Sequence, residues 1–209
     1  MLLLAIVTAL FSAANLVATI ALHPIAPVVP PDAGALSAIL IRLGAFLSAG
    51  WLPNYVALSG LALAAVIFLA RTISPYLRIF VTMYGAGFLF LASLTLLGSL
   101  DVLPPWAVEL LPPNFSATAA AAFALIVYGV SFLPVIRTIT KLADPYFEAG
   151  VSSSEFGRPF SWLGKTEGQV GSGLVAILIF INLFQVAMQI RLNLWGRDLF
   201  NALQGKDLP

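Results

Sequence analysis

Cysteine is absent from the 209-residue chain, and charged residues are scarce. Without cysteine the chain forms no disulfide and offers no thiolate as a metal ligand or nucleophile. Asp, Glu, Lys and Arg together make up 9% of the residues, whereas soluble domains carry about 25%. So few charges do not cover a water-facing surface, which excludes a soluble globular protein. The net charge of +1 and the lack of a basic patch do not indicate nucleic-acid binding.

Apolar residues make up 60% of the chain and are grouped in long blocks. A helix needs roughly 20 apolar residues to cross the hydrocarbon core of a membrane, and several blocks reach or approach this length. Only helices and closed barrels satisfy every backbone group in lipid, and the period-2 alternation of barrel strands is absent. The sequence therefore predicts an all-α integral membrane protein with about five transmembrane helices plus one interfacial or re-entrant helix.

Five blocks are predicted to span the membrane. The first could be mistaken for a signal peptide, but it lacks a positively charged start and its apolar part is longer than 7–15 residues. A cleaved signal remains the alternative for this block. We expect Pro134 to kink the fourth span, and small residues in the second and fourth spans to allow close helix packing. The predicted spans are residues 1–22, 54–70, 79–100, 117–136 and 170–190.

The stretch 36–52 is also apolar, but it is short and has Arg42 near its middle. A cationic residue at that depth costs about 2.5–3.5 kcal/mol. We expect this helix to lie at the interface or to re-enter, with Arg42 reaching the headgroups. In the proline-rich loop before it, His23 and Asp32 are too few ligands for a metal site.

The distribution of Lys and Arg predicts the orientation. The connection 101–116 has neither residue, whereas the connections 71–78 and 137–169 contain Arg71, Arg78, Arg137, Lys141, Arg158 and Lys165. By the positive-inside rule the two basic connections are cytoplasmic. If 36–52 does not cross, the N-terminus is also cytoplasmic and the C-terminus emerges on the outer face.

The last predicted span continues into a polar segment with two faces. Leu192, Trp195, Leu199 and Leu203 recur at helical spacing as an apolar stripe, and Asn193, Arg197, Asn201 and Gln204 form a polar stripe. Asp198 lies between the stripes, within helical reach of Asn201. Polar side chains close to a membrane helix usually face a bundle interior or a wet cavity. The alternative is an ordinary helix end with interfacial polar residues.

Residues 185–207, "QVAMQIRLNLWGRDLFNALQGKD", resemble the first core helix of the bacterial SbmA/BacA-like (YddA-type) ATP-binding cassette transporters. Peroxisomal fatty-acyl transporters look similar. Members share an Asn-x-Trp-x-x-Asp-Phe/Leu-Phe/Tyr-x-Ala-Leu-Gln run. Here it reads Asn193, Trp195, Asp198, Leu199, Phe200, Ala202, Leu203 and Gln204. Gly196 and Leu199 depart from the usual polar and aromatic residues. Residues 156–174 occupy the place of the family's entry segment, with fewer Trp and Arg residues than expected.

The resemblance implies three parts. Residues 1–136 would be an N-terminal membrane extension of about four transmembrane helices. Residues 137–169 would be a cytoplasmic connector and interfacial entry segment, and 170–209 the truncated first helix of a transporter membrane domain. In the inner membrane of a bacterium, such a transporter moves peptides, cobalamin-like molecules or long-chain acyl compounds. The residues expected to line the substrate path or a subunit contact are Asn193, Trp195, Arg197, Asp198, Asn201 and Gln204.

The resemblance also implies partners that this chain does not contain. These are the rest of the transporter core, a nucleotide-binding domain that uses ATP and Mg²⁺, and a second copy in a homodimer. The stretch 159–166, "PFSWLGKT", is no substitute for that domain, because Pro159 stands where a phosphate-binding loop needs its first Gly. With no acid, base, nucleophile or metal cluster, we expect no enzymatic activity from this chain. The alternative function is a complete small membrane assembly or interaction subunit whose last helix docks on a partner.

Overall fold

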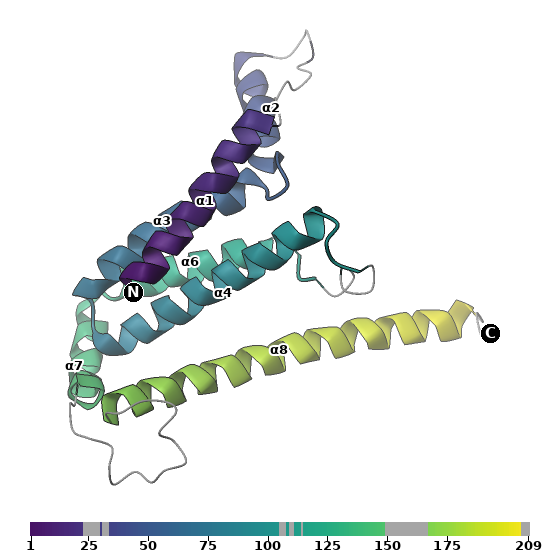
Figure 1. The fold of residues 1–209 in the computed structure, drawn as a ribbon. Helices are drawn as coiled ribbons and strands as arrows, with labels where there is room; N and C mark the ends of the chain where they lie inside the picture. The colour runs from purple at the N-terminus through teal and green to yellow at the C-terminus, as the bar shows by residue number, and fades with distance from the viewer. Residues whose placement is uncertain are drawn as a thin grey trace. The chain divides into compact units, whose positions relative to one another are not determined.

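A computed structural model describes residues 1–22, 30, 34–104, 108, 111–113, 115–148 and 167–205, and every regular element in this part of the chain is helical (Figure 1). The elements are α1 (Leu2–Leu22), α2 (Ala35–Ser48), α3 (Asn54–Leu69), the 3₁₀ helix η1 (Ala70–Thr72), α4 (Pro75–Ser99), α6 (Phe115–Val130), α7 (Pro134–Glu148) and α8 (Glu167–Gly205). The helices divide into two compact units, Met1–Asp144 and Pro145–Pro209, and each is described by itself.

Four helical segments are long and apolar enough to cross a membrane. They are Leu2–Leu22, Asn54–Thr72, Pro75–Ser99 and Gly168–Gln204, and the bent pair Phe115–Val130 and Pro134–Phe147 provides a fifth if it counts as one span. The all-helical prediction with four or five helices of membrane length is therefore confirmed. The 14-residue α2 is about 21 Å long, short of the roughly 30 Å hydrocarbon core.

Within the first unit, α1 and α3 run antiparallel and pack closely. A Cβ atom added to Gly50 would meet the side chain of Thr19, and one added to Gly60 would meet Ser12 and Phe88. Gly50 also has a φ of 95°, which favours glycine at the turn into α3. The pairing of Thr19 with the start of α3 places Met1 at the other end of α3, near Arg71.

The core of the first unit is built from small and branched residues, as expected for closely packed membrane helices. In α3 the buried face includes Val56, Ala57, Gly60, Leu63, Ala64 and Ile67, and in α6 it includes Ala117, Ala121 and Ala124. Phe88 of α4 is fully buried in the same cluster. The predicted close packing through the small residues of 54–70 and 117–122 is confirmed.

Pro134 begins a new helix instead of kinking the predicted span 117–136. Helix α6 ends at Val130, and α7 starts at Pro134 at an angle of 93°. Between them, the amides of Phe132 and Leu133 donate to carbonyls three residues earlier. Proline disfavours the helical conformation of the residue before it, and its fixed φ suits the first position of a helix. The prediction of one kinked helix was therefore wrong.

Two predicted connections are shorter than expected. Helix α4 starts at Pro75, so Arg78 lies in its first turn and not in a loop 71–78. Residues 137–148 belong to α7, so the predicted connector 137–169 begins with a helix. The rest of that connector up to residue 166, including the phosphate-loop-like stretch, lies outside the described residues, as do His23 and Asp32.

Candidate functional site: the polar stripe of α8 and a basic cavity

The second unit is dominated by α8, a single helix of 39 residues. At 1.5 Å per residue it is about 58 Å long, nearly twice the roughly 30 Å hydrocarbon core. Near its start, a Cβ atom added to Gly171 would come within 2.5 Å of the Tyr146 ring. Glycine at this position therefore lets Tyr146 of α7 lie directly against the α8 backbone. The helix continues without a break past residue 190, as the sequence predicts.

The polar and apolar stripes of α8 lie on opposite sides of the helix. At 100° per residue, Asn193, Arg197, Asn201 and Gln204 fall within an arc of about 80°. The centre of the apolar stripe, formed by Leu192, Trp195, Leu199 and Leu203, lies about 160° away. All eight side chains are exposed. The helix therefore presents two chemically different faces to its surroundings.

Of the six predicted site residues, the structure places four on the polar face. Trp195 lies on the apolar face and is 65% exposed, and Asp198 lies between the two faces. Within the described residues, the only hydrogen bond or ion pair among these six side chains joins Arg197 Nε to Asp198 Oδ1 at 3.4 Å. Both side chains are more than 60% exposed, so this ion pair contributes little to stability.

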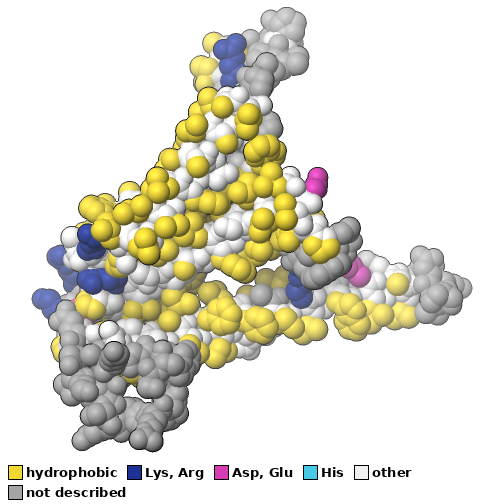
Figure 2. All heavy atoms as spheres, viewed as in Figure 1, with side chains coloured by type: hydrophobic (Ala, Val, Ile, Leu, Met, Phe, Trp, Pro, Cys, Tyr) yellow, Lys and Arg dark blue, Asp and Glu magenta, His cyan; other side chains and the backbone are white. Residues whose placement is uncertain are grey.

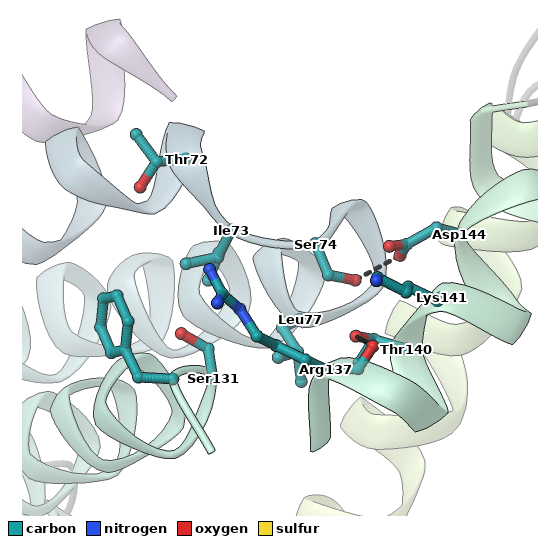
Figure 3. A pocket seen from close by; sticks show the side chains of 10 residues that line it. Thr72, Ile73, Ser74, Leu77, Ser131, Arg137, Thr140, Lys141 and Asp144 are labelled. Carbon is teal, nitrogen blue, oxygen red and sulfur yellow. Dashed lines mark hydrogen bonds between the residues drawn. The ribbon is translucent and has the colours of Figure 1, made fainter. Parts of the chain in front are cut away.

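The first unit contains a polar cavity that sequence reasoning missed. It has a volume of about 150 Å³ and lies between α7 and the turn from α3 to α4 (Figure 3). Across it, the Ser74 hydroxyl donates a hydrogen bond to Asp144. Figure 3 shows Arg137 extending from α7 toward Ile73 and Ser131. The cavity is lined by Thr72, Ile73, Ser74, Leu77, Ser131, Phe132, Arg137, Thr140, Lys141 and Asp144.

Basic residues gather at this end of the first unit (Figure 2). Arg78 Nη2 donates to the carbonyls of Arg71 and Ile73, at 3.2 Å each, and so ties the start of α4 to the turn before it. The Arg71 guanidinium lies 4.9 Å from the Phe68 ring centre, within cation–π range. With Arg137 and Lys141, this end of the unit carries four described basic side chains, and Asp144 lies among them.

A signal for the cavity was present in the sequence. Val135, Ile139 and Leu142 recur at helical spacing, and Arg137, Lys141 and Asp144 recur on the opposite face. The charges of this helix also fit the positive-inside rule, so they indicate topology as readily as an amphipathic helix. No sequence pattern shows that this polar face packs against residues 72–77, because that contact joins segments about 65 residues apart.

The arrangement offers hydrogen-bond donors and acceptors but no recognisable catalytic constellation. In the described part of the chain, no three His, Asp or Glu residues gather in a group that could hold a metal ion. Comparison with known proteins gives no match: no family model, no curated protein and no solved structure is significantly similar to this chain.

Proposed function

We propose that the chain is the membrane-spanning part of an ATP-driven transporter of the bacterial inner membrane, in which α8 is the first helix of the transport core. The observation that carries the proposal is the unbroken length of α8 combined with its two exposed faces. A membrane anchor needs about half of this length. In the additional turns, apolar and polar side chains lie on separate faces. Such a separation is not expected of a helix end that has no neighbours.

The two faces of α8 call for different neighbours. The apolar stripe of Leu192, Trp195, Leu199 and Leu203 is suited to packing against other helices, and the polar stripe to a water-filled space. Polar side chains at membrane depth or close to it usually face such a space, since lipid does not solvate them. Peptides, cobalamin-like molecules and long-chain acyl compounds are the cargo classes that the family resemblance suggests.

In this proposal, residues 1–136 form an N-terminal extension whose first residue lies on the cytoplasmic side. The support is that Met1, Arg71, Arg78, Arg137 and Lys141 all lie at the same end of the first unit, while Arg42 lies beyond the opposite end of α3. If the N-terminus is cytoplasmic, these basic residues also face the cytoplasm, as the positive-inside rule requires. Partners are then the remaining core helices, a nucleotide-binding domain and a second copy of the transporter.

Cysteine labelling tests the orientation of the two stripes, because the chain has no cysteine of its own. Single variants Asn193→Cys and Asn201→Cys are compared with Leu192→Cys and Leu199→Cys in native membranes, using a membrane-impermeant maleimide. A water-filled cavity predicts labelling of the Asn positions at least several-fold faster than the Leu positions. Equal labelling of both stripes would mean a helix end projecting into solvent and would contradict the cavity.

Labelling by itself does not establish ATP-driven transport, which needs a separate experiment. The coding sequence after residue 209, or a neighbouring gene, should encode further spans and a nucleotide-binding domain. In that assembly the double variant Asn193→Ala/Arg197→Ala should reduce cargo uptake, with Gly196→Ala as the control. Unchanged uptake, or a stop codon with no ATPase gene nearby, would favour the assembly subunit that docks through α8.

A further inference from the structure

We propose that the cavity between α7 and the α3–α4 turn binds the phosphate of an anionic lipid headgroup, held by Arg137 and Lys141. The inference does not depend on the transporter proposal. It requires only that the turn at residues 131–133 lies at the headgroup depth of a membrane.

The hydrogen-bonding capacity of the cavity favours an anion. Its hydroxyl groups already donate elsewhere: Ser131 to the Tyr128 carbonyl at 2.6 Å, Thr140 to that of Arg137 at 3.3 Å, and Thr72 to that of Leu69 at 2.8 Å. Asp144 accepts from Ser74. The side chains of Arg137 and Lys141 donate to no other described residue, and neither lies within 4.0 Å of a described carboxylate. Their N–H groups are the donors left for a ligand.

The two cations are complementary in geometry. Arg137 and Lys141 are four residues apart in α7 and therefore lie one turn apart on the same face. A guanidinium binds phosphate oxygens in a bidentate manner, and an ammonium acts as a mobile point charge. The volume of about 150 Å³ is far larger than the roughly 10–15 Å³ that one water requires. An anionic headgroup phosphate has both the charge and the size to enter.

The surroundings of the cavity favour a lipid over a free phosphate ion. Phe132, Leu133 and Val135 at the end of α6 and the start of α7 are more than half exposed, and Leu142 on the apolar face of α7 is 84% exposed. The helix thus turns its polar face toward the protein and its apolar face outward. Acyl chains would cover this apolar surface while the phosphate occupies the cavity. Basic pockets at the cytoplasmic ends of membrane helices bind anionic headgroups in this manner.

The test is native mass spectrometry of the purified 209-residue chain with phosphatidylglycerol or phosphatidylcholine. We expect phosphatidylglycerol to bind in preference to phosphatidylcholine, and the variant Arg137→Gln/Lys141→Gln to bind it about 30-fold more weakly, given the usual contribution of two cations near a membrane surface. The control Arg42→Gln/Arg197→Gln has the same change in net charge and should bind within twofold of the unmodified chain.

A third variant distinguishes the loss of the two charges from misfolding. Arg137→Lys/Lys141→Arg keeps both charges and should retain most of the binding even if the neutral variant loses helical content. Equal binding of the two lipids, or equal loss in the Arg42/Arg197 control, would overturn the proposal. Displacement of phosphatidylglycerol by millimolar inorganic phosphate would also overturn it and assign the cavity to free phosphate.

Discussion

Helices α3 and α8 are both apolar enough to cross a membrane, but they differ in how much of each is buried within its own unit. In α3, 44% of the residues in the most apolar stretch are buried inside the protein, compared with 12% in α8. Apolarity is required by the lipid in both cases. Burial additionally requires small residues and fitted neighbours, which α3 has at Ala57, Gly60 and Ala64. The comparison marks α3 as the centre of a packed bundle within the first unit, whereas α8 is largely exposed within its own unit.

The largest expected effect comes from filling the α1–α3 contact. Gly60→Leu places a side chain against Ser12 and Phe88, and overpacking of this kind costs about 3 kcal/mol or more. Gly196→Leu is the matched control in α8, because a Cβ atom there meets nothing within 4 Å. The free energy of unfolding is measured by SDS titration of the purified chain in micelles, followed by circular dichroism. Equal destabilisation by both variants would contradict the difference in packing.

A smaller effect is expected from removing an aromatic side chain. Phe88 is fully buried, whereas Phe180 is 62% exposed. Because lipid is about as apolar as the protein core, Phe88→Ala loses mainly packing, about 2 kcal/mol, which is below the usual cost in a soluble core. Phe180→Ala should change the free energy of unfolding by less than about 0.5 kcal/mol. The same titration measures both, and a loss in Phe180→Ala as large as that in Phe88→Ala would show that the Phe180 side chain packs against protein.

The smallest effect concerns a hydrogen bond between α2 and α3. Asn54 Nδ2 donates to the Phe46 carbonyl at 2.7 Å, and Asn54 is buried. Losing such a bond costs about 1 kcal/mol, so Asn54→Ala should destabilise the chain by that amount. Asn182 Nδ2 makes a similar bond to Leu178 within α8, at 2.8 Å and exposed, so Asn182→Ala serves as the control. Hydrogen exchange of the α2 amides should rise in Asn54→Ala alone; unchanged exchange would mean that the bond does not hold α2.

Much of the fold could be predicted from local pattern. Three of the five predicted spans correspond to helices whose boundaries differ by a few residues, and the span 170–190 lies inside the longer α8. Apolar blocks of sufficient length are a local property of the chain. The continuation of α8 was also predictable, since its two stripes keep helical spacing and no proline interrupts them from Leu192 to Gln204. The stripe residues were therefore placed correctly on the helix, while their role as a transport path stays a proposal.

The errors arose where one residue permits two structures. Pro134 is compatible with a kink inside a helix or with the first position of a new one. The structure has the second arrangement, and the polar face of α7 then packs toward Ser74 and Leu77. Local pattern does not distinguish these outcomes, because the deciding contacts come from the α3–α4 turn.

The amino-acid sequence by itself determined that this chain is helical, of membrane character, and ends in a long two-faced helix, since these depend on apolar content and spacing along one segment. Only the tertiary structure decided that α6 and α7 meet at 93°, that Met1 and Arg71 share one end, and that Arg137 and Lys141 line a cavity. Those features depend on contacts between segments far apart in the sequence, and these contacts are set by how whole helices pack.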